Sequence, residues 1–272
     1  MVVQKSLFES VDGKHVLITG ASSGIGQAVA EYLGGSRAVL HLVARNHEKL
    51  QSVADSLAVK GTKVFVHTCD LSIEADVSRL VESIVSDHGG VDILINNAGR
   101  SIRRDVTESF ERLHDFRRTM ELNYFAAMGL ILGFLPTMTE RGYGHVINVL
   151  TMGVQVRTPR FAAYVASKSA LDAATRSIAG ELKGKNLHFT QVYLPLVRTP
   201  MIEPTKVYKD MKAWTPEEAA EAILGAVVSR DSTVSLAMGK VAELLHFAIP
   251  DRALSIVNWF YRREKKMERE AS

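Results

Sequence analysis

The 272-residue sequence predicts an α/β fold in which a single doubly wound parallel sheet has helices on both faces. Two patterns support this fold class. Short apolar segments alternate with helical patterns from Gly13 onward, and a glycine-rich turn joins the first apolar segment to the first helix. No linker, repeat or low-complexity segment interrupts the alternation. We therefore expect one domain, with the sheet and its helices in residues 1–240 and a C-terminal helical extension in residues 241–272.

The strands are predicted from short apolar runs, and the helices from apolar residues three and four positions apart. The first half predicts strands at His15–Thr19, Val39–Val43, Lys63–His67 and Asp92–Asn96, with helices at Ile25–Leu33, His47–Val59 and Ala75–His88. The second half predicts strands at His145–Leu150, His188–Leu194 and Thr233–Ala237, with helices at Asp115–Met138, ending at Gly142, and Ala162–Lys183. Thr215-Pro-Glu-Glu is typical of a helix start, because threonine caps a helix and proline fits its first turn.

The composition excludes several classes of protein. Hydrophobic residues make up 46% and charged residues 23% of the chain, as in ordinary soluble domains, and the net charge of +3 is too small to indicate nucleic-acid binding. The single cysteine, Cys69, excludes an intramolecular disulfide and fits a cytoplasmic location, while the nine histidines show no metal-ligand spacing. We expect neither a secretory signal nor a transmembrane helix, because no apolar segment of suitable length is present.

The glycine-rich turn follows Gly20-x-x-x-Gly24-x-Gly26 between the first strand and the first helix. Glycine lets the backbone turn tightly and approach a pyrophosphate, which the positive end of a helix attracts. A glycine turn by itself is weak evidence, but its position between strand and helix favours a dinucleotide site. The residues expected to bind the cofactor here are Gly20, Ser22, Ser23, Gly24, Ile25 and Gly26.

The end of the second strand indicates which cofactor is preferred. Sites selective for NAD commonly carry an acidic residue at this point, which binds the ribose hydroxyls. This chain has Ala44 followed by Arg45, and a guanidinium suits the 2′-phosphate of NADPH/NADP+. The alternative is a solvated surface arginine.

Tyr164-Val-Ala-Ser-Lys168 is the strongest catalytic pattern in the chain. On a helix the two side chains lie one turn apart on one face. A neighbouring ammonium lowers the pKa of a tyrosine, which would make Tyr164 a proton donor and acceptor near neutral pH. With the nucleotide site, this pair predicts hydride transfer between a nicotinamide and a carbonyl carbon.

These motifs resemble the short-chain dehydrogenase/reductase family, whose fold is Rossmann-like. The similarity covers Gly13 to Met238. Its motifs are Thr19-Gly-x-x-x-Gly-x-Gly26, Asp70, Asn96-Asn-Ala-Gly99, Asn123 and Tyr164-x-x-x-Lys168.

The resemblance implies further roles. Asp70 and Leu71 would flank the adenine, and Asn97, Ala98 and Gly99 would line the cofactor side of the sheet. Asn123 would hold a water in a proton relay with Lys168, which would also bind the nicotinamide ribose beside Tyr164. Val197 and Thr199 would contact the nicotinamide amide; the alternative for Thr199 is a turn residue before Pro200.

The chain departs from the family at Thr151, where the resemblance implies a catalytic serine. Threonine keeps the hydroxyl donor, so it can still bind a substrate oxygen, but its methyl group adds bulk and restricts χ1. The preceding residue, Leu150, offers no second hydroxyl. We expect Thr151 to act with Tyr164, Lys168 and Asn123 as the catalytic group.

Three runs resemble the reductase part of bacterial fatty acyl-CoA reductases, namely residues 97–104, 114–125 and 194–206. This implies reduction of a long-chain acyl-CoA thioester to a fatty aldehyde. The arginines near predicted strand ends, Arg100, Arg103, Arg104 and Arg198, would then meet CoA phosphates or form local salt bridges. Two alternatives remain open. One is a ketone or secondary-alcohol dehydrogenase of 3-oxoacyl or steroid type, and the other is a non-catalytic nucleotide-binding regulator.

The segment Val241–Phe260 is rich in apolar residues and is followed by the basic run Tyr261–Lys266. Such a helix can lie peripherally on an anionic membrane or cover an acyl channel. It can equally be an oligomer contact or pack on the core. The family resemblance implies a homodimer or homotetramer, formed through the long helix and the helix that carries Tyr164.

Overall fold

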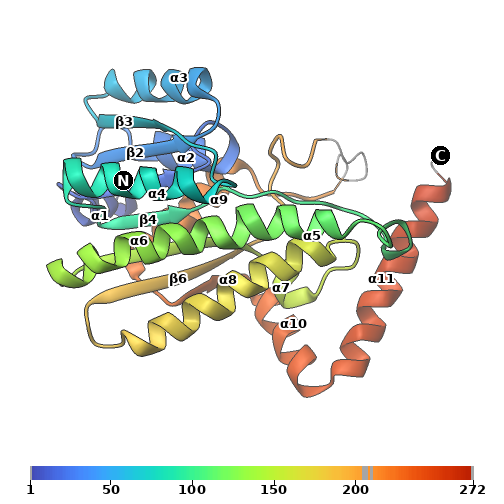
Figure 1. The fold of residues 1–272 in the computed structure, drawn as a ribbon. Coiled ribbons are helices and arrows are strands. Elements are labelled where there is room, and N and C mark those ends of the chain that lie inside the picture. The colour runs from blue at the N-terminus through green and yellow to red at the C-terminus, as the bar shows by residue number, and fades with distance from the viewer. Residues whose placement is uncertain (1, 204–207, 209–210, 271–272) are drawn as a thin grey trace.

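The computed structural model describes residues 2–203, 208 and 211–270 of the chain (Figure 1). Its centre is a seven-stranded parallel sheet in the order β3-β2-β1-β4-β5-β6-β7. The strands are β1 His15–Thr19, β2 Val39–Ala44, β3 Lys63–Thr68, β4 Ile93–Asn96, β5 Gly144–Thr151, β6 Leu187–Leu194 and β7 Thr233–Ser235. The strand order reverses direction between β1 and β4, so the sheet is doubly wound and the predicted fold class is confirmed.

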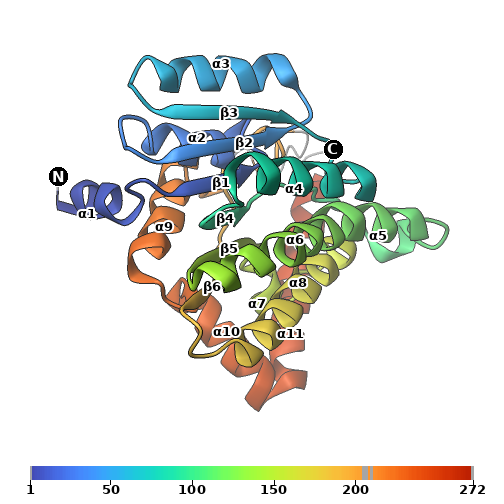
Figure 2. The ribbon, with the colours of Figure 1, turned by 60° about the vertical axis from the view of Figure 1, so that its left-hand side comes forward.

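Helices cover both faces of the sheet (Figures 1 and 2). One face is covered by α1 Val2–Ser10, α2 Gly24–Tyr32, α3 His47–Ala58 and α9 Pro216–Ser229. The other face is covered by α4 Glu74–His88, α6 Ala126–Arg141 and α8 Ala162–Glu181. The shorter or C-terminal helices are α5 Leu113–Met120, α7 Gly153–Val156, α10 Ala237–Ala248 and α11 Pro250–Glu270, with a 3₁₀ turn, η1, at Val106–Glu108.

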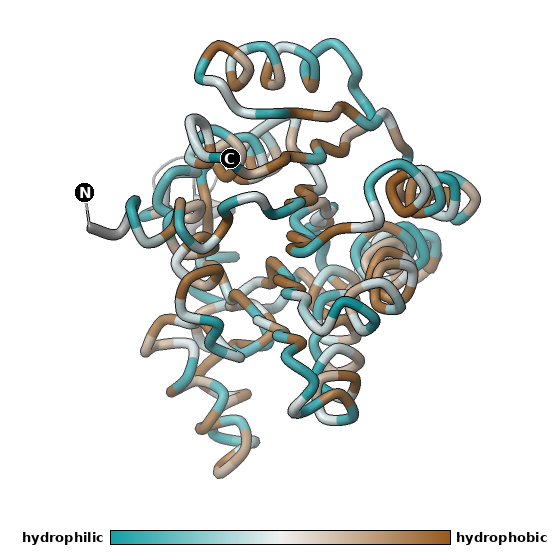
Figure 3. Tube along the Cα trace, turned by 90° about the vertical axis from the view of Figure 1, so that its left-hand side faces the viewer, coloured by the Kyte–Doolittle hydropathy of each residue, from teal (hydrophilic) through white to brown (hydrophobic). Residues whose placement is uncertain are grey.

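Successive side chains of the buried strands point to opposite faces of the sheet, and each face has its own apolar core. In β1, Val16 and Ile18 belong to the core under α2 and α9, whereas Leu17 between them belongs to the core under α4 and α6. Successive side chains of a strand point to opposite faces, so a strand buried on both sides is apolar throughout. Figure 3 shows these apolar stretches running between the helical layers.

The helix predicted at Asp115–Met138 is interrupted. A π turn, η2, at Glu121–Phe125 separates α5 from α6 within the helical run Leu113–Arg141, and Gly142 ends that run with φ +65°. By length and composition this run is, among the described residues, the one helix that could cross a membrane. Here it packs against α4, α8 and the sheet, which accounts for its apolar character.

The apolar segment Val241–Phe260, treated as helical from the sequence, belongs to two helices and not to one. The chain forms two helices, α10 and α11, which meet at Ile249 and Pro250. Proline cannot continue a helix from within but fits its first turn, so Pro250 ends one helix and starts the next. The helices α1 and α7 were not expected from the sequence, and the division of the chain at residue 240 stays a prediction.

Candidate active site

A cavity of about 590 Å³ opens at the carboxyl ends of the parallel strands. It brings together most of the predicted site residues. Those that line it are Gly20, Ser22, Ser23, Gly24, Ile25, Arg45, Leu71, Asn97, Ala98, Gly99, Thr151, Tyr164, Lys168, Val197 and Thr199. Gly26, Asp70 and Asn123 do not line the cavity.

The glycine turn is shaped for close approach at the start of α2. Gly20 and Gly24 have φ angles of +69° and +55°, which favour glycine. A Cβ on Gly26 would meet the carbonyl oxygen of Gly20 and lie 2.6 Å from Asn97 Nδ2, so this glycine serves packing and does not line the wall. The backbone N–H groups at the start of α2 therefore remain accessible to an anionic group.

Thr19 ties the glycine turn to the end of β4. Its hydroxyl accepts hydrogen bonds from the backbone N–H groups of Asn97 and Ala98, both at 2.9 Å, and donates to Ile95 O at 3.2 Å. Asn97 Nδ2 in turn donates to Thr19 O at 2.9 Å. The two strands that flank the cavity floor are therefore held in register at their ends.

The exposed Arg45 stands at the rim of the cavity beside Ala44. Asp70 lies behind this rim, where its carboxylate accepts hydrogen bonds from the Ser72 hydroxyl and backbone N–H. These bonds, with the charges of Arg45 and Arg100, hold the pKa of Asp70 below its ordinary value. The carboxylate of Asp70 thus binds Ser72 in the turn after β3, and the next residue, Leu71, lines the cavity.

Tyr164 and Lys168 face the cavity from the first two turns of α8. Burial raises the pKa of Tyr164 to about 12, and a contact with the Thr151 hydroxyl only partly opposes the shift. Lys168 Nζ donates to Val149 O at 2.8 Å, and burial lowers the pKa of Lys168 to about 8. The prediction of a lowered pKa for Tyr164 is wrong here, because burial raises the pKa and outweighs the opposing hydrogen bond with Thr151.

Thr151 ends β5, opposite Leu194 of β6. Its hydroxyl oxygen accepts a hydrogen bond from the Gly153 N–H at 3.1 Å. That bond uses an oxygen lone pair and leaves the hydroxyl proton available for donation into the cavity. The donor expected at this position is therefore oriented by the turn that follows the strand.

Asn123 is buried in the π turn η2, behind Gly99. Its amide nitrogen donates to Arg100 O and Ser167 Oγ, both at 2.9 Å, and its Oδ1 accepts from Arg100 N at 2.7 Å. The side chain thus joins α8 to the loop after β4 and does not touch the cavity. A π turn within a longer helix is frequent at functional sites.

The arginines considered for CoA phosphates are engaged elsewhere in the fold. Arg104 pairs with Asp115 at 3.1 Å, and Arg198 donates to Met211 O at 3.1 Å. Arg103 pairs with Glu264 of α11 at 2.8 Å. Arg100 lies beside Arg45, Asp70 and Arg118, and burial lowers its pKa. None of the four arginines lines the cavity, which favours local contacts within the protein over contacts with CoA phosphates.

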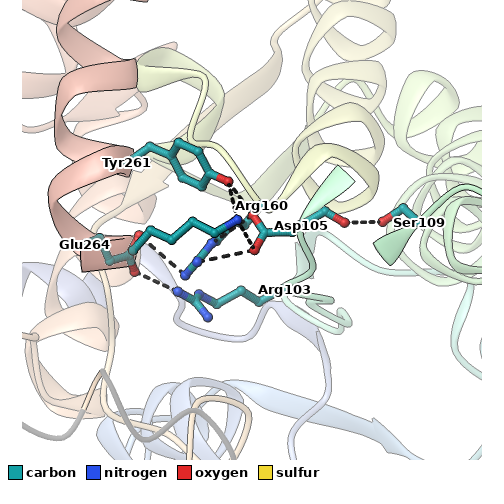
Figure 4. A network of polar contacts seen from close by, with 7 residues as sticks. Arg103, Asp105, Ser109, Arg160, Tyr261 and Glu264 are labelled. Atoms are coloured by element: carbon teal, nitrogen blue, oxygen red, sulfur yellow. Dashed lines mark hydrogen bonds and ion pairs between the residues drawn. The ribbon is translucent and has the colours of Figure 1, made fainter. Parts of the chain in front are cut away.

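Arg103 and Glu264 belong to a polar network, the Asp105 cluster, shown in Figure 4. Asp105 accepts hydrogen bonds from Tyr261 Oη at 2.7 Å, Arg160 Nε at 3.2 Å and Lys265 Nζ at 3.4 Å. Burial alone would raise the pKa of Asp105, but the bonds from Tyr261 and Arg160 outweigh it and lower the pKa. The cluster fastens α11 to the loops that precede α5 and α8.

Sequence motifs did not identify the apolar wall of the cavity. Its members are Met152, Phe161, Val165, Leu196, Met201, Ile202, Tyr208 and Met211. Most of them follow the ends of β5 and β6, and that position relative to the strands was the available signal. Within the described residues, no group of three or more His, Cys, Asp or Glu side chains is arranged to hold a metal ion.

The model of the short chain dehydrogenase family matches residues 14–209. Among proteins of similar sequence, a fatty acyl-CoA reductase of Acinetobacter baylyi is 46% identical over 89% of this chain and 82% of its own. A fatty acyl-CoA reductase of Mycobacterium tuberculosis is 48% identical over 85% and 79%.

Solved structures are similar as well. L-sorbose reductase from Gluconobacter frateurii, complexed with NADPH and L-sorbose, has a TM-score of 0.74 and 28% identity, covering 82% of this chain and 94% of that one. A metagenomic short-chain oxidoreductase in complex with NADP has a TM-score of 0.69 and 26% identity, covering 84% and 100%.

Proposed function

The chain belongs to the short-chain dehydrogenase family, and from this premise we propose that it reduces a long-chain fatty acyl-CoA to a fatty aldehyde with NADPH. One observation carries the proposal. Thr151, Tyr164 and Lys168 share a cavity with the glycine turn on one side and an apolar wall on the other. A dinucleotide and an apolar acyl chain would therefore meet beside the hydroxyl groups of Thr151 and Tyr164.

The residues at the glycine turn suit NADPH. The left-handed Gly20 and Gly24 let the backbone approach a pyrophosphate, and the exposed Arg45 beside Ala44 offers a cation to a 2′-phosphate. Leu71, Asn97, Ala98, Gly99, Val197 and Thr199 would complete the dinucleotide site. Bound NADPH supplies the hydride.

The cofactor preference is tested at Ala44. Ala44→Asp places a carboxylate where a ribose hydroxyl is favoured and a phosphate is repelled. We expect kcat/KM for NADPH to fall at least about tenfold relative to NADH, the equivalent of one lost charge-assisted contact. Ala58→Asp, at the end of α3, is the control. An unchanged NADPH/NADH ratio in Ala44→Asp would count against the role of Arg45.

The substrate oxygen would lie between two hydroxyl groups. Thr151, oriented by Gly153 N–H, donates one hydrogen bond, and Tyr164 donates another and then its proton. A hydride added to a thioester carbonyl yields a thiohemiacetal oxyanion, which these donors stabilise. Collapse of that species returns the proton from the oxygen to Tyr164, breaks the carbon–sulfur bond, expels CoA thiolate and leaves the aldehyde. Lys168 holds a positive charge nearby, and Asn123 secures the loop after β4 against α8.

A ketone or secondary-alcohol dehydrogenase is the alternative. It is favoured by the pairing of Arg103 and Arg104 within the protein, since these side chains are not directed to CoA phosphates. The assay that separates the two functions measures NADPH oxidation with palmitoyl-CoA and the free thiol released alongside it. Equal amounts of thiol and oxidised cofactor support acyl-CoA reduction. Turnover of ketones without thiol release would replace the proposal by the alternative.

We further propose a cytoplasmic homodimer or homotetramer with a peripheral contact to a membrane. The oligomer is supported by Phe125 and Leu132 on the long helical run, which remain more than half exposed although they are large and apolar. The membrane contact is supported by the C-terminal helices, whose surface is described next.

A further inference from the structure

The outward side of α11 carries a stripe of apolar and basic residues. Its members are Arg252, Ile256, Trp259, Arg263 and Lys266, at successive spacings of four, three, four and three residues. These spacings place the five side chains on one side of the helix, and all five are exposed. Phe260 lies beside the stripe, and the Arg263 guanidinium lies 5.6 Å from the Trp259 ring.

The corner between α10 and α11 adds apolar surface. Phe247 is 87% exposed and Leu244 is 64% exposed on α10, and Ile249 lies at the corner itself. Figure 1 shows this corner projecting away from the sheet. Scattered exposed apolar residues are ordinary, but aromatic and aliphatic side chains gathered on one projecting hairpin indicate an interaction surface.

The inward side of α11 is held in place, so the outward stripe has a defined direction. Tyr261 and Lys265 bind Asp105, and Glu264 binds Arg103, all from the side opposite the stripe (Figure 4). On α10, His246 and Glu243 bind Val156 O and Gln155 of the α7 turn. The hairpin is therefore anchored to the body by polar contacts, while its apolar residues face outward.

The charge on the exposed side of the hairpin is mostly positive. Among residues 237–266, the exposed basic side chains are Lys240, Arg252, Arg262, Arg263 and Lys266, and the exposed acidic ones are Glu243 and Asp251. Apolar residues with interspersed arginines and lysines are typical of helices that lie in the headgroup region of an anionic bilayer. The core of a protein–protein interface, in contrast, is depleted in charged residues.

We propose that the outward side of the α10–α11 hairpin, centred on Phe247, Ile256, Trp259 and Phe260, docks on an anionic lipid bilayer. The inference rests on the proposed function, because a long acyl chain favours a bilayer over water. The Asp105 cluster connects this surface to the site. It binds the loop that carries Phe161 of the cavity wall, and Arg103 lies 6.0 Å from the ring of Tyr208, another wall residue.

The test is cosedimentation of the full chain with vesicles of phosphatidylcholine alone or mixed with phosphatidylglycerol. We expect binding to the mixed vesicles that weakens with added salt. The double variant Arg252→Glu/Arg263→Glu should lower the affinity about tenfold or more. Lys49→Glu/Lys60→Glu changes an exposed residue of α3 and an exposed residue of the turn after it, makes the same change in net charge and is the matched control. Equal loss in both variants, or no vesicle binding by the wild type, would overturn the proposal.

A second pair of variants tests the apolar part. Trp259→Ser/Phe260→Ser should also lose at least about tenfold in vesicle affinity, whereas Phe110→Ser, at an exposed phenylalanine outside the hairpin, should not. If Trp259→Ser/Phe260→Ser instead dissociates an oligomer and leaves vesicle binding unchanged, the surface is a contact between copies and the membrane proposal fails.

Activity is measured separately, with a short, soluble acyl thioester and no vesicles. The surface variants should then match the wild type, because none of them touches the cavity. A wild type that binds anionic vesicles but reduces no thioester would refute the proposed function and leave the docking surface standing. A wild type that reduces the thioester but does not bind vesicles would refute the docking surface and leave the proposed function standing.

Discussion

Two residues that line the cavity have pKa values shifted in opposite directions. Burial raises the pKa of Tyr164 to about 12 and lowers the pKa of Lys168 to about 8. At neutral pH the tyrosine therefore keeps its proton, and the lysine remains mostly charged. Such a tyrosine is suited to donating a proton to an oxygen that becomes strongly basic during reduction, while a buried ammonium one helical turn away stabilises the negative charge that develops.

Thr151 is the residue at which the sequence departs from the pattern that the family resemblance implies, and the role of its hydroxyl can be tested. Thr151→Val keeps the shape but removes the donor, so we expect kcat to fall by about 10² to 10³, as for loss of an oxyanion donor. Thr151→Ser keeps the donor and should remain within about tenfold of the wild type. Steady-state kinetics at saturating substrate checks both. Equal activity of Thr151→Val and Thr151→Ser would show that this hydroxyl plays no part in the reaction.

At the scale of elements, α11 depends on contacts that no local pattern indicates. Asp105 is a single carboxylate bound by Arg160, Tyr261 and Lys265, and the side chains of Asp105 and Arg160 are only 12% and 5% exposed. A buried pair of this kind is strongly destabilised when one partner is removed, because the other charge stays buried without compensation.

Asp105→Asn should accordingly lower the free energy of unfolding by about 3 kcal/mol. The control is Asp12→Asn, which breaks a pair with Arg37, a side chain that is 83% exposed, and should change the free energy of unfolding far less, because water screens the pair. Urea unfolding of both variants gives the comparison. A loss for Asp105→Asn no larger than that for Asp12→Asn would mean that the Asp105 cluster does not hold α11.

The elements themselves were predicted with different success. Each of the seven strands was expected within a few residues of its observed bounds. Short apolar runs bounded by turn residues identify them, and such runs depend on neighbouring positions alone. The helices α1 and α7 were not expected, because α1 precedes the strand–helix alternation and α7 is a single turn of four residues. The π turn at Glu121–Phe125 was also not expected, because its sequence keeps the apolar spacing of a continuous helix.

At the scale of the whole molecule, histidines inside the sheet link stability to pH. His41 is fully buried between two others, with His15 Nδ1 2.9 Å from its Nε2 and His67 Nε2 3.0 Å from its Nδ1. Burial, with the neighbouring His67, His15, His88 and Lys63, lowers the pKa of His41 to about 3. His145 of β5, also buried, has its pKa lowered to about 3, mainly by burial.

The sign of the effect follows from these pKa values. The unfolded chain protonates its histidines below about pH 6.5, whereas the folded chain keeps His41 and His145 neutral down to about 3. Stability is therefore present above pH 6.5 and is lost as the pH falls below it. Each such histidine contributes a loss of up to about 1.4 kcal/mol per pH unit in this range.

His41→Gln should make the free energy of unfolding less dependent on pH between about 6.5 and 5, by up to about 1.4 kcal/mol per unit. Urea unfolding at a series of pH values measures the slope. His47→Gln, at an exposed position on α3, is the matched control. If His41→Gln leaves the wild-type slope unchanged, His41 is not a source of the pH dependence.

The sequence by itself determined the fold class and the family. Strand–helix alternation and the spacing of Gly20, Gly24, Gly26, Tyr164 and Lys168 are properties of nearby residues, so they can be recognised before the chain is folded. Only the tertiary structure decided that burial raises the pKa of Tyr164, and that Arg103 and Arg104 bind acidic residues of the protein. It also decided that the C-terminal segment forms a hairpin with one anchored and one exposed side.

The physical reason is distance along the chain. Asp105 meets Arg160 across 55 positions and Tyr261 across 156, and Arg103 meets Glu264 across 161. Which charged groups become neighbours, and how much water they lose, depends on how sheet and helices pack together. Short-range periodicity determines the elements, whereas the pKa values, the pairing of charges and the surfaces left exposed emerge only when those elements are assembled.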